Sequence, residues 1–120
     1  MKSYRELEVW KVSMDLVDAV YELTDRFPKS EVFNLTSQLR RAVVSVPSNI
    51  AEGWGRENTK DYIRFLLISK GSLMEIEVQL EIAVRQKFVA KEEIQKSWDL
   101  SQSSLKMLVK LIYSLRNPKN

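Results

Sequence analysis

The side chains with the most distinctive chemistry form a polar row within the segment 38–56. An α-helix turns by about 100° per residue, and on such a helix seven polar residues of this segment fall within one arc of about 100°. They are Gln38, Arg41, Ser45, Ser48, Asn49, Glu52 and Arg56. Guanidinium groups bind phosphates through charge-assisted hydrogen bonds. One interpretation of the row is therefore a contact with a nucleic-acid backbone.

The candidate phosphate ligands are the basic residues in this segment and just after it. They are Arg40, Arg41, Arg56, Lys60 and Arg64. Trp54 and Tyr62 lie close to them in the sequence and offer aromatic faces on which a base can stack. Trp10 and Trp98 lie in amphipathic patterns and are expected to pack in the core.

A second interpretation makes the same polar row structural. Gln38, Asn49, Glu52 and Glu75 are the candidates for a polar network that bonds within the chain or to a neighbouring subunit. Such groups fix the register of helices and subunits more than they add stability. The sequence leaves both interpretations open.

Catalysis and metal binding have little support, because the chain contains no His and no Cys. The commonest general base near neutral pH, the thiolate nucleophile and the commonest transition-metal ligands are all missing. Glu52, Glu75, Glu77 and Glu81 resemble the carboxylates of di-iron bundles, but no Glu-x-x-His pair completes such a site. We expect no catalytic residue, no metal, no cofactor and no enzymatic activity.

Composition indicates one folded domain over residues 1–120, with 44% hydrophobic and 29% charged residues and only three Gly and three Pro. No apolar run is long enough to be a signal peptide or a membrane span, so we expect a cytoplasmic protein. The net charge of +3 is unevenly distributed: residues 40–70 carry six basic and three acidic side chains, and residues 106–120 carry four basic and none acidic.

Apolar residues recur at steps of three and four in four segments, which predicts helices over 8–26, 31–53, 59–87 and 92–116. Pro28, the Gly53 to Gly55 turn and Pro118 mark the breaks. Short connections between long helices predict an all-α, antiparallel up-and-down four-helix bundle. In the second helix the apolar arc covers about 200°, roughly twice what one core requires, which predicts self-association. Gly71-Ser72 in the middle of the third helix allows a close approach by another backbone.

The predicted topology also indicates where basic side chains gather. The turn at 53–58, the amino terminus and the end of the fourth helix must share one end of the bundle. Six basic residues would gather there: Arg56, Lys60, Arg64, Lys110, Arg116 and Lys119.

Several motifs together resemble one family. The chain contains Glu8-Val-Trp-Lys, Tyr21-x-x-Thr-x-x-Phe-Pro, Leu35-x-x-Gln-Leu-Arg-Arg-Ala, Ser45-Val-Pro-Ser-Asn-Ile-Ala-Glu-Gly, Phe65-Leu and Gly71-Ser-x-x-Glu. These motifs resemble the four-helix-bundle proteins encoded in intervening sequences of bacterial 23S ribosomal RNA genes. The characteristic positions are Trp10, Gln38, Arg40, Arg41, Asn49, Glu52, Gly53, Arg56, Gly71, Ser72 and Glu75.

The resemblance implies a left-handed bundle, assembly into ring-like homopentamers and no enzymatic activity. It also implies nucleic-acid binding, since similar pentameric bundles accompany retroelement reverse transcriptases. The sequence thus predicts a non-enzymatic cytoplasmic homo-oligomer that binds RNA or DNA through phosphates. The alternative is a structural or protein-interaction module that docks a protein partner and whose arginines serve subunit contacts.

Overall fold

The computed structural model describes residues 1–119, and all regular structure in this range is helical. The long elements are α1 (Glu8–Thr24), α2 (Leu35–Trp54), α3 (Thr59–Arg85) and α4 (Gln95–Arg116). Short 3-10 helices precede or join them: η1 (Tyr4–Glu6), η2 (Lys29–Glu31) and η3 (Lys91–Ile94). Asn120, the last residue of the expected domain, lies outside the described range.

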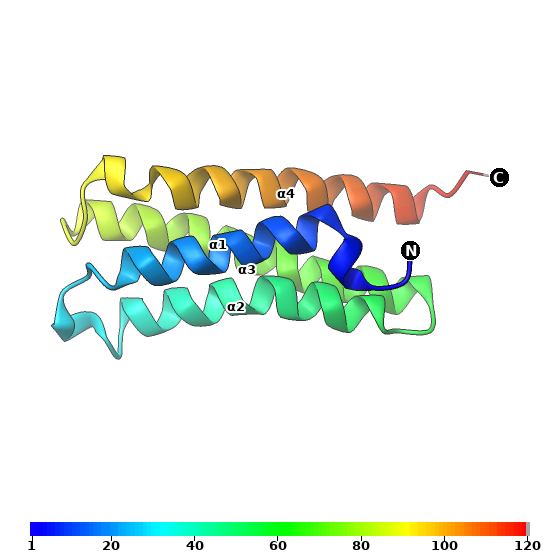
Figure 1. Cartoon of the computed structure of the whole chain (residues 1–120), viewed down its shortest axis with the longest axis horizontal. Coiled ribbons are helices and arrows are strands. Elements are labelled where there is room, and N and C mark those ends of the chain that lie inside the picture. The colour runs from blue at the N-terminus through cyan, green and yellow to red at the C-terminus, as the bar shows by residue number, and fades with distance from the viewer. Residues whose placement is uncertain (120) are drawn as a thin grey trace.

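Consecutive helices run in opposite directions, and each packs against its neighbours in the chain, with α1 also packed against α4 (Figure 1). The result is an elongated body of 51 × 23 × 20 Å. The prediction of an all-α four-helix bundle is confirmed, while its left-handedness stays a prediction. None of the helices in the described range is both long enough and apolar enough to span a bilayer.

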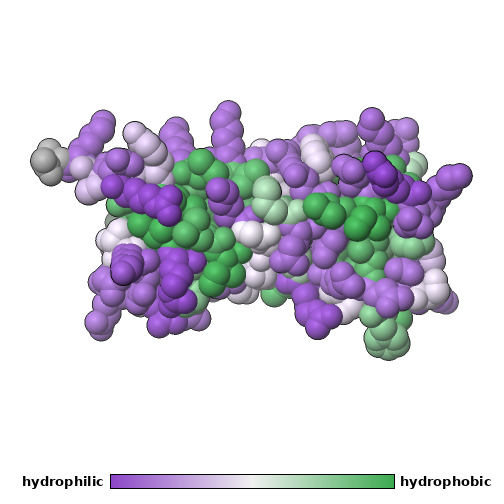
Figure 2. Space-filling view, turned by 180° about the vertical axis from the view of Figure 1, so that it is seen from behind, coloured by the Kyte–Doolittle hydropathy of each residue, from purple (hydrophilic) through white to green (hydrophobic). Residues whose placement is uncertain are grey.

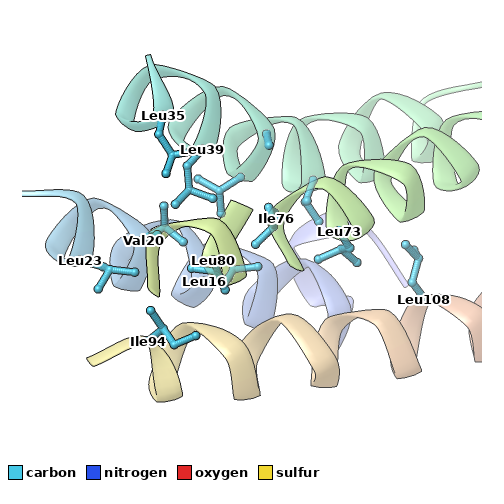
Figure 3. Packing of buried hydrophobic residues seen from close by; sticks show 14 of the residues in the cluster. Leu16, Val20, Leu23, Leu35, Leu39, Leu73, Ile76, Leu80, Ile94 and Leu108 are labelled. Carbon is cyan, nitrogen blue, oxygen red and sulfur yellow. The ribbon is translucent and has the colours of Figure 1, made fainter. Parts of the chain in front are cut away.

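The core runs along the centre of the bundle and receives side chains from every α-helix (Figure 3). Leu16 of α1, Leu39 of α2, Leu73 of α3 and Leu108 of α4 have no exposed surface. Burying a leucine side chain is worth about 2 kcal/mol, so this central column is the main source of stability. Trp10 and Trp98 are half-buried and pack against the core, as expected.

The connection between α1 and α2 differs from the prediction. α1 ends at Thr24 because the amides of Arg26 and Phe27 bond to the carbonyls of Leu23 and Thr24 in a tighter turn before Pro28. The segment after Pro28 forms η2 instead of the first turn of a long helix, and α2 begins only at Leu35. The helical pattern of the sequence therefore continues four residues further towards the amino terminus than the helix does.

α2 and α3 form the closest pair in the bundle because small residues line their contact. The Ser69 hydroxyl donates to the carbonyl of Val46 at 2.8 Å, and the Ser72 hydroxyl donates to the Ser45 hydroxyl at 2.9 Å. At the end of α2, a Cβ added to Gly53 would lie 2.9 Å from the Cβ of Phe65. Gly53 therefore allows the close approach of these helices.

Gly71 lacks the neighbour that the sequence predicted. It is exposed, and a Cβ added there would meet nothing within 4 Å. Within one chain the close approach expected at Gly71-Ser72 is made by Ser72, whose hydroxyl bonds to Ser45 of α2, and not by Gly71. The broad apolar arc of α2 is mostly covered by the chain itself, although Val44 keeps 41% of its surface exposed.

α3 ends in a Schellman motif, in which the amide of Phe88 bonds to the carbonyl of Ala83 and the amide of Lys87 to that of Val84. Lys87 holds a φ of 63°, a left-handed conformation that favours glycine. η3 follows, where the Glu93 carboxylate accepts from the Ala90 amide at 2.8 Å. This hydrogen bond and the ion pair with Arg26 at 3.0 Å lower the pKa of Glu93.

Replacing Lys87 by glycine is expected to raise the free energy of unfolding by about 1 kcal/mol, because glycine adopts the left-handed conformation without a Cβ clash. Gln86→Gly is the matched control, since Gln86 has a φ of −81° and gains nothing from glycine. Urea titrations of both variants at one protein concentration measure the effect. A loss of stability in Lys87→Gly would contradict the prediction.

Candidate nucleic-acid interface

The five predicted phosphate ligands lie in two separate places. Arg40 and Arg41 belong to the first half of α2, whereas Arg56, Lys60 and Arg64 surround the turn between α2 and α3. Along the helix axis the two groups are about 20 Å apart. They cannot form one compact site within a single chain.

Arg40 is committed to contacts inside the chain. Its Nε donates to the Thr24 hydroxyl at 2.8 Å, and a terminal nitrogen donates to the Asp25 carboxylate at 3.0 Å and to the Tyr21 carbonyl at 3.4 Å. The guanidinium carbon lies 4.5 Å from the centroid of the Tyr21 ring. Arg40 therefore anchors the carboxyl end of α1, where unpaired carbonyls favour a cation. This geometry supports the structural interpretation for Arg40.

Arg40→Ala is expected to lower the free energy of unfolding by about 2 kcal/mol, because it removes charge-assisted bonds to the end of α1. Arg41 is exposed, and its replacement by alanine is expected to change stability by less than about 0.5 kcal/mol. Thermal and urea unfolding of the two variants form the test, with equal charge removed in each. Equal losses from both would contradict a special role for Arg40.

Arg56 is also partly committed within the chain. It pairs with Glu52 one helical turn away, at 2.9 Å, and its guanidinium carbon lies 4.6 Å from the Phe65 ring centroid. Arg64 lies at the same distance from that ring, so the two guanidinium groups both contact Phe65. The ion pair of Arg64 with Asp61 is long, at 3.8 Å, and its side chain is 60% exposed. Arg64 is therefore the more available of the two cations.

The predicted structural polar network does not form as one unit within the chain. Asn49 donates to the carbonyl and the hydroxyl of Ser45 on its own helix, both at 2.9 Å, and Glu52 pairs with Arg56. Gln38 and Glu75 are exposed side chains. Among residues 1–119 the polar row thus divides into local contacts along α2, and its links to α3 are the Ser45–Ser72 hydrogen bond and the contact of Arg56 with the Phe65 ring.

The bundle end with the α2–α3 turn also holds the amino terminus and the end of α4 (Figure 1). Three cations from two helices, Lys60, Arg64 and Arg116, border an open hollow of about 700 Å³ there. Ile63 and Leu67 contribute its apolar lining, and the carboxylate of Asp61, the partner of Arg64, also borders it. Within residues 1–119, neither Lys60 nor Arg116 makes an ion pair. We call Lys60, Arg64 and Arg116 the terminal basic cluster.

Arg116 is the residue that the sequence-based list of phosphate ligands omits. Its distance in sequence from Lys60 hides the relationship, and only the antiparallel topology brings the end of α4 to the start of α3. The topological prediction that basic residues gather at this end of the bundle contained the signal.

The aromatic residues near this end are mainly packing groups. Trp54 and Tyr62 meet edge to face, with ring centroids 6.3 Å apart, and both are half-buried. The Tyr62 hydroxyl is buried and has no hydrogen-bond partner among the described residues. Burial raises the pKa of Tyr62 above its ordinary value of 10.0, because the charged phenolate is poorly solvated.

Tyr62→Phe is expected to raise the free energy of unfolding by about 1 kcal/mol, since it removes a buried hydroxyl without a partner. Because the folded pKa is the higher one, titration of Tyr62 leaves the free energy of unfolding unchanged below its unfolded pKa and lowers it as pH rises from there through the folded pKa. The variant should lose this alkaline destabilisation. Tyr113→Phe, at a residue 67% exposed, should change neither quantity. Urea unfolding across alkaline pH measures both effects, and an unchanged profile in Tyr62→Phe would contradict them.

The carboxylates that resembled part of a di-iron site do not gather. Among residues 1–119, no group of three or more Asp or Glu side chains is arranged to hold a metal ion.

The family model of the 23S rRNA-intervening sequence protein matches residues 5–110. A crystal structure of a protein of unknown function from the S23 ribosomal protein family of Bacteroides thetaiotaomicron superposes with a TM-score of 0.80 and 23% sequence identity. The similarity covers 87% of this chain and 97% of that chain, and at this identity it shows the shared fold. No curated protein matches the sequence. Because the family model spans most of the chain, the protein belongs to the 23S rRNA-intervening sequence protein family.

Proposed function

We propose that this protein is a non-enzymatic, cytoplasmic binding module that assembles into a homopentameric ring and binds RNA or DNA phosphates through the terminal basic cluster. The observation that carries the proposal is the convergence of Lys60, Arg64 and Arg116 around one open hollow, with two of the three free of ion pairs within residues 1–119. Arg40 and Arg56 serve contacts inside the chain, and Arg41 is a secondary phosphate contact.

In this proposal the affinity for nucleic acid comes from several copies of the terminal basic cluster in one ring. A single chain with a net charge of +3 presents few phosphate contacts and binds weakly. Copies related by symmetry present the same cluster several times, and each contact made raises the effective concentration for the next. Six or more phosphate contacts make binding weaken on the order of a thousandfold between about 50 and 200 mM salt.

Fluorescence-anisotropy titrations of a structured RNA and a DNA duplex at these two salt concentrations test the proposal. The triple variant Lys60→Ala, Arg64→Ala and Arg116→Ala is expected to abolish binding at the higher salt. The control replaces Lys29, Lys91 and Lys96 by alanine, which removes the same charge from exposed positions at the opposite end of the bundle. Absence of binding at the lower salt, or equal losses in both triple variants, would overturn the proposed cluster.

A protein-interaction module is the second candidate. Its support is the intramolecular use of Arg40 and Arg56, together with apolar side chains left exposed on α3. The salt dependence of binding distinguishes the two functions, because binding through an apolar interface does not weaken steeply as ionic strength rises.

A further inference from the structure

α3 carries a second apolar face that its own bundle leaves uncovered. Leu67, Gly71, Met74, Val78 and Ile82 follow one another at steps of three and four, so they form one stripe about 22 Å long. Val78 is 58% exposed and the other three large side chains are between 37% and 40% exposed. We call this stripe the α3 ridge. Figure 2 shows apolar surface in two areas along the back of the bundle, the side on which α3 lies.

Gly71 at the middle of the ridge points to a covering helix. An exposed glycine inside a helix costs about 1 kcal/mol relative to alanine, and no atom of residues 1–119 lies close enough to require it. At Gly53 the absence of a Cβ allows α3 to pack directly against the backbone of α2. A partner of the same kind at Gly71 must come from another molecule.

The same chain carries a complementary hollow on another side. Between α1 and α2, apolar side chains line an open groove of about 360 Å³. The groove is lined by Trp10, Met14, Val17, Val44, Pro47 and Ala51. We call it the α1–α2 groove. α1 and α3 are not packed against each other, because they occupy opposite corners of the bundle. The ridge and the groove can therefore face two different neighbours at once.

Charges beside the two surfaces match. Helical geometry places Lys70 and Glu75 on opposite flanks of the ridge, Asp18 on the α1 side of the groove and Arg41 on the α2 side. None of these four makes an ion pair within residues 1–119. Of the two directions in which a ridge can enter the groove, one sets Lys70 beside Asp18 and Glu75 beside Arg41. The other direction sets like charges together.

We infer that the α3 ridge of one copy docks into the α1–α2 groove of a second copy, in the direction that the four charges select. Such a contact is heterologous, because each copy uses two different surfaces, and it generates a ring when the rotation closes. The inference deepens the self-assembly part of the proposed function and does not depend on nucleic-acid binding.

Two exposed valines allow a direct test. Val78→Glu places an unpaired charge in the ridge and Val44→Glu places one in the groove, and neither residue belongs to the buried core. Each is expected to weaken association at least about a hundredfold, so that each variant sediments as a single chain. Val109→Glu on α4, at a residue 45% exposed and outside both surfaces, should keep the wild-type mass. Circular dichroism melts confirm that all three variants fold.

Mixing the two defective variants gives the decisive result. A Val78→Glu chain keeps its groove and a Val44→Glu chain keeps its ridge, so an equal mixture should form a complex of two chains and no larger species. A mixture that stays monomeric, or a Val44→Glu variant that keeps the wild-type mass, would overturn the ridge-and-groove contact.

The direction of docking is tested by charge exchange. Lys70→Glu should weaken association by up to about fivefold, and Asp18→Lys in the same chain should restore it. Failure of this rescue would overturn the assigned direction. If the wild-type protein sediments as one chain, both the contact and the ring are overturned. If the wild-type protein forms a complex of several chains and both valine variants keep its mass, the contact alone is overturned.

Discussion

Gly53→Ala is expected to lower the free energy of unfolding by about 2 kcal/mol, although alanine is the better helix former. The added Cβ would lie 2.9 Å from the Cβ of Phe65, 3.0 Å from Cδ1 of Tyr62 and 3.1 Å from the Tyr62 carbonyl oxygen. Two of these three atoms cannot rotate away, so α2 and α3 must separate near their turn. Urea unfolding at a fixed protein concentration measures the loss.

Gly55 provides the matched control for Gly53. It lies two residues further along, its φ is −77°, and an added Cβ would meet only ordinary contacts at 3.6 Å and beyond. Gly55→Ala is therefore expected to leave stability unchanged or slightly raised. Similar losses in the two variants would mean that a general property of the turn, and not the contact with α3, explains Gly53.

Leu80→Ala is expected to have the largest effect on stability, a loss of about 3 kcal/mol. Leu80 has no exposed surface and belongs to the core cluster (Figure 3), so truncation leaves a cavity at the centre of the bundle. The loss combines the transfer free energy of the missing carbons with the cavity term. Chemical denaturation monitored by circular dichroism gives the value.

Leu80→Met separates volume from chemistry at the same position. Because it conserves most of the volume, it should lower stability by less than about 1.5 kcal/mol. If Leu80→Ala and Leu80→Met cost the same, a cavity is not the cause of the loss.

The repeating apolar residues of the sequence predict the four helices and their antiparallel order, since one apolar stripe per helix is sufficient to define a bundle. They fail at the start of α2, where residues 31–34 continue the pattern but turn before Leu35. The reason is local: Asn34 adopts non-helical angles with φ −117° and ψ −109°, which a periodicity argument does not detect.

The candidate site was less predictable because an arginine has the same sequence signal whether it is free or paired. Arg40 and Arg41 are adjacent, yet one bonds to the end of α1 and the other is exposed. Neighbouring residues on a helix are rotated by about 100° from each other, so Arg40 and Arg41 face different directions. Which of the two is paired can be predicted only once the side of α2 that meets α1 is known. The second apolar face of α3 is hidden in the sequence for a related reason. Its members alternate with core residues such as Leu73 and Ile76, so the two stripes merge in the sequence.

The location of the amino terminus and the end of α4 at one end of the bundle determines how the chain can be extended. Any tag or fusion partner joined to the amino or carboxyl terminus emerges beside the terminal basic cluster and would compete with the proposed nucleic-acid ligand for the same space. An insertion in the loop between Phe88 and Lys91 projects from the opposite end. For the same reason, a circular permutant that links the two termini and opens this loop should keep the four-helix order, while placing both new chain ends far from Lys60, Arg64 and Arg116.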